Sequence, residues 1–309
     1  MLTGSRAFSK GVAADEMKQR INMIAEYNVP VRMRDRTHLS TDVYRPPGSS
    51  RYPVLLSRTY YGKSRSDLGD KCSRQFIEYF VSRKYAVVVQ DCRGRYDSEG
   101  EFYPEIYDAN DGYDTIEWCA KQPWSNGKVG MFGCSYPGCV QWYCAHLNNR
   151  HLRCIAPRDA TSDPYFDGGF MRGGVIQGFM QWLLDTSGRT DRTNLAKSVN
   201  LNEVYKQLPT RNLDEHLGFR FPFWKDYVDH ATYGSYWKRT SIHDKYQLIR
   251  VPSLNLGGWY SQSDVIGTIR NFVGVATMGP RKTRKNHRLL IGPWEHCDSA
   301  PKVREVDYG

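Results

Sequence analysis

The chain has 309 residues, of which 40% are hydrophobic and 25% charged, as is ordinary for a globular protein with one large domain or two. No apolar run approaches the roughly 20 residues that a bilayer-spanning helix needs, so we expect no membrane partner. The net charge of +10 admits a nucleic-acid partner. Its densest basic cluster, 281–288, directly precedes an apolar strand and has no binding motif, so we expect a solvated loop and no nucleic acid.

Residues 1–29 mix basic and acidic side chains without an apolar core, which predicts the absence of a secretory signal and a cytoplasmic location. The eight cysteines are scattered, and none has the Cys-x-x-Cys spacing. This scatter favours buried small residues over a disulfide framework or a zinc site. For Cys134 and Cys139 we expect core packing, with sensitivity to oxidation as the alternative.

Strands and helices alternate through the first half of the chain. Segment 29–46 alternates in polarity, which predicts a β-hairpin. The pattern then predicts strands at 53–57, 86–91, 129–134 and 153–157, and helices at 75–85, 108–120 and 141–147. Because strands alternate with helices, the fold class is α/β, with a doubly wound and mostly parallel sheet.

The alternation breaks at about 162–241, which is rich in aromatic residues, has a helical stretch at 174–184 and shows no clear strand. We interpret this region as a helical cap inserted into the sheet domain. The α/β pattern resumes at 252–258 and ends with 287–293. The predicted organisation is a first core part at 1–160, a cap at 161–242 and a second core part at 243–309.

An apolar strand that ends in Gly133-Cys134-Ser135 passes directly into a segment with helical spacing. This layout predicts a nucleophile elbow, in which a serine on a tight strand-to-helix turn exposes its hydroxyl above the sheet. The next residue, Tyr136, offers its N–H to an oxyanion. The second glycine, Gly138, lies three residues after the serine rather than two, so the generic pattern is only partly met. The alternative is a tight turn with an incidental serine.

A nucleophilic serine needs a histidine base, and the histidine needs a carboxylate to hold its tautomer. His296 lies just past the C-terminal end of a buried strand, where sites of open α/β sheets gather. Asp264 is the only carboxylate in the loop after strand 252–258 and precedes the histidine, as chain order requires. Its alternative role is that of a helix N-cap. Tyr61 follows an early strand, where a second oxyanion donor usually originates, although a loop tyrosine is more often simple packing.

Several sequence blocks spread over the chain occur in one order. They are 33–35, 39–46, 58–63, 90–102, 111–118, 133–138 and 291–296. Together they resemble the family of cocaine esterase, α-amino-acid ester hydrolases, glutaryl acylases and X-prolyl dipeptidyl-peptidases, nearly from end to end. The resemblance implies an α/β-hydrolase sheet, an inserted helical cap and a C-terminal jelly roll, and its elbow spacing accounts for the displaced second glycine.

By this resemblance, Ser135 is the nucleophile and His296 the base, and the Tyr61 hydroxyl and the Tyr136 N–H form the oxyanion hole. The chain departs from the family in three ways. Ser261 stands where the family has its acid, so that Asp264 is displaced along the loop or the triad is impaired. Tyr60 replaces a usual proline, and the chain stops about where the jelly roll would begin, as a truncated or partial chain would.

We therefore predict a serine hydrolase that cleaves a small-molecule ester or amide through an acyl-enzyme intermediate, without a metal or other cofactor. Aromatic residues of the cap are candidates for an acyl pocket, although core packing is the commoner role. They are Phe170, Phe179, Trp182, Phe223 and Trp224. The alternatives are an X-prolyl dipeptidyl-peptidase and an inactive remnant of the fold. An exposed docking face for the missing jelly roll would favour a homo-oligomer.

Overall fold

The computed structural model describes residues 22–64, 73–161, 163–167, 171–172, 175–176, 182, 186, 188–190, 199–218, 223–261, 264–298, 300, 302–303 and 305–308. The main strands are β1 (Ile24–Arg32), β2 (His38–Arg45), β3 (Tyr52–Thr59), β4 (Ala86–Asp91), β5 (Ser125–Cys134), β6 (Leu152–Arg158), β9 (Leu254–Gly258) and β10 (Arg288–Gly292). The helices that contact them include α2 (Arg74–Ser82), α3 (Asp108–Lys121), α4 (Tyr136–Ala145) and α11 (Asp264–Thr277).

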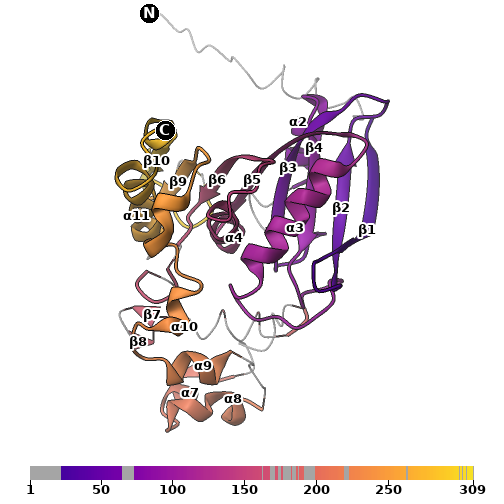
Figure 1. Ribbon diagram of the computed structural model, residues 1–309. Helices are drawn as coiled ribbons and strands as arrows, with labels where there is room; N and C mark the ends of the chain where they lie inside the picture. The colour runs from indigo at the N-terminus through magenta and orange to yellow at the C-terminus, as the bar shows by residue number, and fades with distance from the viewer. Residues whose placement is uncertain are drawn as a thin grey trace, which may run out of the picture.

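These strands form one eight-stranded sheet in the order β1-β2-β4-β3-β5-β6-β9-β10 (Figure 1). The six strands from β4 to β10 run parallel, and β1 and β2 form an antiparallel hairpin at one edge. The predicted hairpin and the doubly wound, mostly parallel α/β sheet are therefore confirmed. The chain moves from β3 outward to β4 and then returns to place β5 on the other side of β3. Binding sites of α/β sheets gather at such a reversal of strand order.

Strand β4 shows why the sheet is covered on both sides. All six of its residues are buried, as expected of a parallel strand with helices on both faces. Because successive side chains point to opposite faces, Val88 joins the main core cluster beneath α3 and α4. Its neighbours Val87 and Val89 pack with Ile77 and Val81 of α2. The sheet is thereby held between two helical layers.

The chain between β6 and β9 contains short elements, several of which lie together beyond one end of the sheet (Figure 1). They are β7 (Met171–Arg172), β8 (Val175–Ile176), α7 (Leu201–Tyr205), η1 (Thr210–Asn212), α8 (Leu213–His216), α9 (Trp224–Asp229), α10 (Ser235–Lys238) and η2 (His243–Leu248). Phe223 and Trp224 are fully buried in the same core cluster as the sheet. Phe170 and Phe179, which are two of the residues predicted as candidates for an acyl pocket, lie outside the described residues.

The predicted helix at 174–184 is wrong at its start, because β8 forms an antiparallel pair with β7 there. Helical spacing is a weak guide where β-branched residues follow a Gly-Gly pair, which is typical of a hairpin turn. Residues 177–181 and 183–185 lie outside the described part of the chain. The division into core and cap at 160 and 242 stays a prediction.

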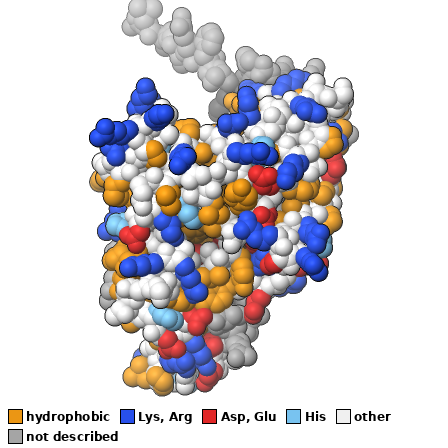
Figure 2. Space-filling model, viewed as in Figure 1, with side chains coloured by type: hydrophobic (Ala, Val, Ile, Leu, Met, Phe, Trp, Pro, Cys, Tyr) orange, Lys and Arg blue, Asp and Glu red, His pale blue; other side chains and the backbone are white. Residues whose placement is uncertain are grey.

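Most residues of the basic cluster are exposed, as a solvated loop requires. Lysine and arginine side chains are spread over the visible face among acidic ones (Figure 2). Within 281–288, the short η3 turn (Arg284–Asn286) is exposed, whereas His287 is buried and its Nδ1 lies 2.8 Å from Ser253 Oγ. The last described elements, β11 (Lys302–Val303) and β12 (Val306–Asp307), pair with each other. Within the parts of the chain that the structure describes, no helix combines the length and apolar character that crossing a bilayer requires.

Candidate active site

The predicted nucleophile, Ser135, lies at the single residue between β5 and α4. Its backbone has φ 63° and ψ −129°, a conformation that costs a non-glycine residue energy and that concentrates at functional sites. The neighbouring strand holds it there, because the Ser135 N–H donates to the Arg158 carbonyl at 2.9 Å. This is the backbone of a nucleophile elbow.

The two glycines that flank this serine are required by packing. A Cβ at Gly133 would lie 2.5 Å from the Pro137 Cβ, and the Gly133 φ of 147° also disfavours any other residue. A Cβ at Gly138 would lie 2.7 Å from the Ala160 Cβ and 2.9 Å from the Arg158 oxygen. The second glycine therefore lets α4 approach β6, and this close contact explains its place three residues after the serine.

Tyr61 meets Ser135 because β3 and β5 are adjacent and parallel, so that the loops after them start at the same edge of the sheet. The Tyr61 hydroxyl lies 3.5 Å from Ser135 Oγ. The hydroxyl of Tyr60 and the Nε1–H of Trp182 both donate to the Tyr61 oxygen at 3.3 Å. Since two groups donate into this oxygen, the Tyr61 proton is available to point toward Ser135. Burial raises the pKa of Tyr61, which keeps that proton in place.

Tyr136 supplies the other predicted donor. It is the first residue of α4, and the first amides of a helix have no carbonyl partner within the helix. Its side chain is anchored below the site, because the Tyr136 hydroxyl donates to Asp108 and also accepts from the Glu105 N–H at 2.7 Å. Arg58 donates to Asp108 in turn. This buried network fixes the start of α4, and with it the direction of the Tyr136 N–H.

The structure brings the predicted base and acid together. His296 Nδ1 lies 3.3 Å from Asp264 Oδ2 and 3.0 Å from Ser261 Oγ. Asp264 begins α11, and Ser261 lies in the loop between β9 and that helix. Burial, and after it the charges of Asp159 and Asp167, raises the pKa of Asp264 to about 8. Ser261 and Asp264 therefore both lie at Nδ1, which is the histidine nitrogen that the acid of a catalytic triad faces.

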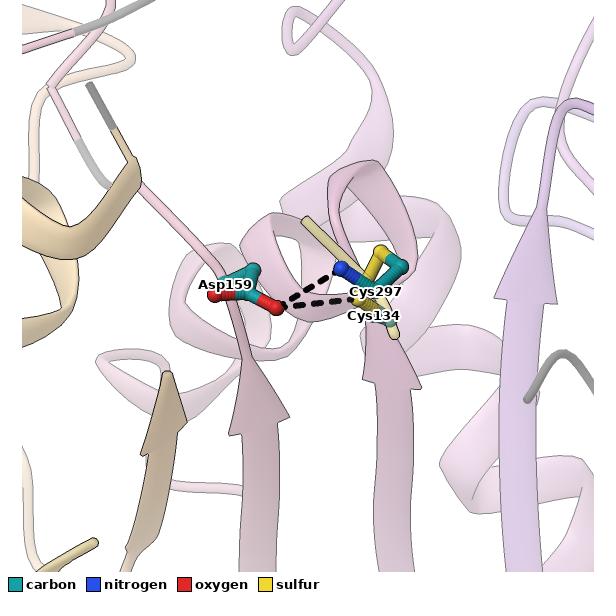
Figure 3. A group of neighbouring side chains, drawn as sticks. All are labelled: Cys134, Asp159 and Cys297. Atoms are coloured by element: carbon teal, nitrogen blue, oxygen red, sulfur yellow. Dashed lines mark hydrogen bonds between the residues drawn. A yellow bond between two sulfur atoms is a disulfide. The ribbon is translucent and has the colours of Figure 1, made fainter. Parts of the chain in front are cut away.

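A disulfide joins Cys134 to Cys297 (Figure 3). The expectation of core packing for Cys134 is therefore wrong, and the two cysteines lie 163 positions apart in the chain. Scatter in the sequence hid this pair, because a parallel sheet brings the ends of distant strands to one edge. Cys139 is buried and unbonded, as expected.

Asp159 lies beside this disulfide and was missed at the level of sequence. Its fully buried carboxylate accepts from the Gly258 N–H at 2.8 Å and from the Cys297 N–H at 2.9 Å. Its place directly after β6 was the available signal. Asp159 and the two cysteines are the candidate metal-ligand cluster among the described residues, but the two sulfurs bond each other and the carboxylate binds backbone amides. These three residues therefore hold the loop that follows β10.

Comparison with known proteins places these features in a family. A model of the X-Pro dipeptidyl-peptidase family (S15) matches residues 35–298. Cocaine esterase from Rhodococcus sp. (strain MB1 Bresler) is 34% identical over 298 residues, which cover 91% of this chain and 50% of that protein. The chain thus spans about half the length of the curated relatives it matches.

Solved structures show the same fold. An aminopeptidase from the marine sediment archaeon Thaumarchaeota archaeon has a TM-score of 0.77 at 22% identity, covering 93% of this chain and 51% of its own. An α-amino acid ester hydrolase has a TM-score of 0.73 at 25% identity, covering 96% of this chain and 51% of its own.

Proposed function

Because the chain belongs to the X-Pro dipeptidyl-peptidase family (S15), we propose that it is a serine hydrolase that cleaves a carboxylic ester or amide through an acyl-enzyme intermediate. The observation that carries the proposal is the strained Ser135 at the turn between β5 and α4, with the Tyr61 hydroxyl 3.5 Å from its Oγ. Acyl transfer requires a nucleophile and a hydrogen-bond donor that converge on one carbonyl group.

In the proposed reaction, Ser135 Oγ attacks the substrate carbonyl carbon while His296 takes the hydroxyl proton. Asp264 and Ser261 lie at Nδ1, so Nε2 acts as the base. The imidazolium then gives this proton to the departing alcohol or amine, which leaves an acyl-serine. Water repeats the sequence, with His296 taking its proton and returning it to Ser135 as the acid product leaves.

The negative charge on the carbonyl oxygen is stabilised by the Tyr61 hydroxyl and the Tyr136 N–H. Both donors are fixed before substrate arrives, Tyr61 by Tyr60 and Trp182 and Tyr136 by its buried hydroxyl network. Donors that need no reorganisation stabilise a developing oxyanion most effectively.

We propose small carboxylic esters as the substrate class, because the relatives include a cocaine esterase and an α-amino acid ester hydrolase. The alternative is an X-prolyl dipeptidyl-peptidase, as the family name suggests. Parallel assays with a p-nitrophenyl ester and an X-Pro p-nitroanilide separate the two, since only a peptidase releases nitroaniline. We also retain a cytoplasmic location as part of the proposal.

The proposal is tested with a fluorophosphonate probe and p-nitrophenyl ester hydrolysis. We expect the wild type to be labelled and active, and Ser135→Ala to lose both labelling and about 10⁴–10⁶-fold in kcat. Ser82→Ala is the matched control, because Ser82 is an exposed serine on α2 and its loss leaves both readouts intact. Folded wild-type protein that is neither labelled nor active would identify the inactive remnant instead.

A further inference from the structure

The disulfide lies at a position that couples it to both reacting side chains. Cys134 directly precedes Ser135, and Cys297 directly follows His296. The bond therefore joins the backbone of the proposed nucleophile to that of the proposed base, with 5.8 Å between the two cysteine Cα atoms.

Without this bond, the sheet gives the two residues no direct link. Ser135 follows β5 and His296 follows β10, and β6 and β9 lie between those strands. With strands about 4.8 Å apart, three spacings separate β5 from β10. The loop after β10 must therefore fold back over two strands to reach the elbow, and the disulfide fastens it there.

Besides the disulfide, hydrogen bonds hold this loop, since the Tyr260 N–H donates to the Trp294 carbonyl at 2.9 Å and Arg158 donates to the Asp298 carbonyl. The Cys297 N–H donates to Asp159, and the His296 ring meets Ser261 and Asp264. The His296 side chain is 37% exposed. Opening the disulfide leaves hydrogen bonds at an exposed loop, which permit shifts that a covalent link prevents.

We propose that Cys134–Cys297 is a thiol–disulfide exchange site that switches the hydrolase. The oxidised form holds Ser135 and His296 in the reacting arrangement, and reduction by a small thiol or dithiol releases the histidine loop and lowers turnover. This inference rests on the proposed function.

The exchange balances with a dithiol as the reductant. One dithiol thiolate attacks the sulfur of Cys297, which is half-buried, whereas Cys134 is 3% exposed. The mixed disulfide forms and Cys134 leaves as a thiolate. The second dithiol sulfur then attacks the mixed disulfide, so that Cys297 leaves as a thiolate and the reductant becomes a cyclic disulfide. Two electrons pass to the protein, and the two thiolates take up two protons.

The predicted cytoplasmic location gives such a bond a specific meaning. Disulfides are rare in the reducing cytosol, and those that occur in mesophiles are usually transient and catalytic or redox-sensing. A bond that is formed only under oxidising conditions would make hydrolysis respond to the thiol pool.

The test measures kcat and KM for a p-nitrophenyl ester in wild type incubated with dithiothreitol at increasing concentration, with a chelator present throughout. The chelator prevents a metal ion from binding to Cys134, Asp159 and Cys297 once the two cysteines are reduced. Alkylation and mass spectrometry report the state of the two cysteines, and circular dichroism reports folding. We expect kcat to fall about 10- to 100-fold as the bond opens, because small misplacements of reacting groups have effects of this size. KM should change little, and oxidised glutathione should restore kcat.

Two variants accompany this titration. Cys297→Ser should show the low kcat of the reduced enzyme and no response to dithiothreitol. Cys154→Ser is the matched control, because Cys154 is an exposed, unbonded cysteine on β6, and it should respond as the wild type does. If Cys297→Ser does not fold, the titration of the wild type still decides.

Each result has one meaning. The proposed switch is wrong if folded protein with an open Cys134–Cys297 bond has an unchanged kcat, even where its thermal midpoint falls. It is also wrong if the bond does not form in the oxidised enzyme. If neither the oxidised nor the reduced form is active or labelled by a fluorophosphonate, it is the proposed hydrolase function that fails.

Discussion

The two sides of the candidate site are built differently. Ser135 and Tyr61 follow central strands of the sheet and are positioned by backbone geometry and close packing, as the strained φ and the required glycines show. Asp264 follows β9 and His296 follows the edge strand β10, where the histidine is more than one-third exposed. At the centre, a Cβ at either Gly133 or Gly138 would clash with its neighbours. At the edge, two side chains, Ser261 and Asp264, lie at the same histidine nitrogen.

Asp264→Asn gives the largest expected effect on this comparison. If Asp264 is the acid, its loss removes the charge that stabilises the imidazolium, and kcat for an ester should fall about 10³–10⁴-fold. Steady-state kinetics checks this. Adding Ser261→Asp to that variant should recover much of the activity, because Ser261 Oγ is already 3.0 Å from His296 Nδ1.

A fall of less than threefold in Asp264→Asn would show that Ser261 or another group orients the histidine. Asp298→Asn provides the matched control, since Asp298 is an exposed aspartate in the loop after β10 that carries His296. Its substitution should leave kcat within about twofold, as is usual for exposed surface changes.

Tyr61→Phe tests the central side of the site. It removes one oxyanion donor and keeps the ring, so kcat should fall about 10²–10³-fold while KM changes little. Tyr52→Phe is the control, because its hydroxyl bonds the Pro47 carbonyl, away from Ser135. Equal kcat in wild type and Tyr61→Phe would remove Tyr61 from the proposed mechanism.

The pH dependence should also distinguish the two sides. Because burial and the nearby carboxylates raise the pKa of Asp264 to about 8, the carboxylate forms only as the pH rises through that value. We expect kcat/KM to climb up to tenfold per pH unit below pH 8 and to level above it. Asp264→Asn should not show this rise of kcat/KM with pH. If the variant and the wild type show the same rise, the titration of His296 alone causes it.

Stability should move in the opposite direction. A carboxyl group whose pKa is raised in the folded state favours folding at low pH, and that contribution is lost as the pH rises from about 4 to about 8. Denaturant unfolding should therefore show that Asp264→Asn loses less stability than wild type over this interval.

Tyr60→Phe probes a smaller contribution at the central side. The fully buried Tyr60 hydroxyl donates to the Tyr61 oxygen at 3.3 Å, and their rings stack with centroids 4.3 Å apart. Losing one neutral hydrogen bond should lower kcat about 2- to 10-fold. The double variant with Tyr61→Phe should be no worse than Tyr61→Phe alone, because Tyr60 acts through Tyr61. Additive losses in that cycle would contradict this positioning role.

The sheet was predictable because buried parallel strands are apolar runs bounded by helices, as β4 illustrates. The elbow was predictable for a related reason, since its backbone demands glycine on both sides of Ser135. Strand β8 was not, because two residues of strand cannot establish a period of two. Short segments are decided by their partners in space.

The two partners of His296 and the disulfide could be identified only from the three-dimensional structure. Sequence order selected Asp264, but only the fold shows that Ser261 competes for the same nitrogen. Cys297 carries no local pattern. The place of Asp159 directly after β6 marks it as a candidate but does not identify its partners, because the residues that both contact are distant in the chain. Pairings across parallel strands depend on strand order, which local periodicity does not contain.

The smallest expected effect concerns the outer face of the edge strand β10 and its neighbour β9. Leu254 and Leu290 are 43% and 50% exposed, and they lie on the face of β9 and β10 away from Gly257, which packs against α11. An uncovered apolar face on an edge strand favours association, so we expect homo-oligomers that Leu290→Lys shifts to monomers. Light scattering on a sizing column measures this. Val273→Lys, an equally exposed apolar site on α11, is the control and should leave the oligomers intact. Because Leu290 lies on the face of β10 opposite α11, which begins with Asp264, kcat per chain should stay within about twofold. A larger loss in Leu290→Lys would mean that the exposed side of the site depends on a second copy.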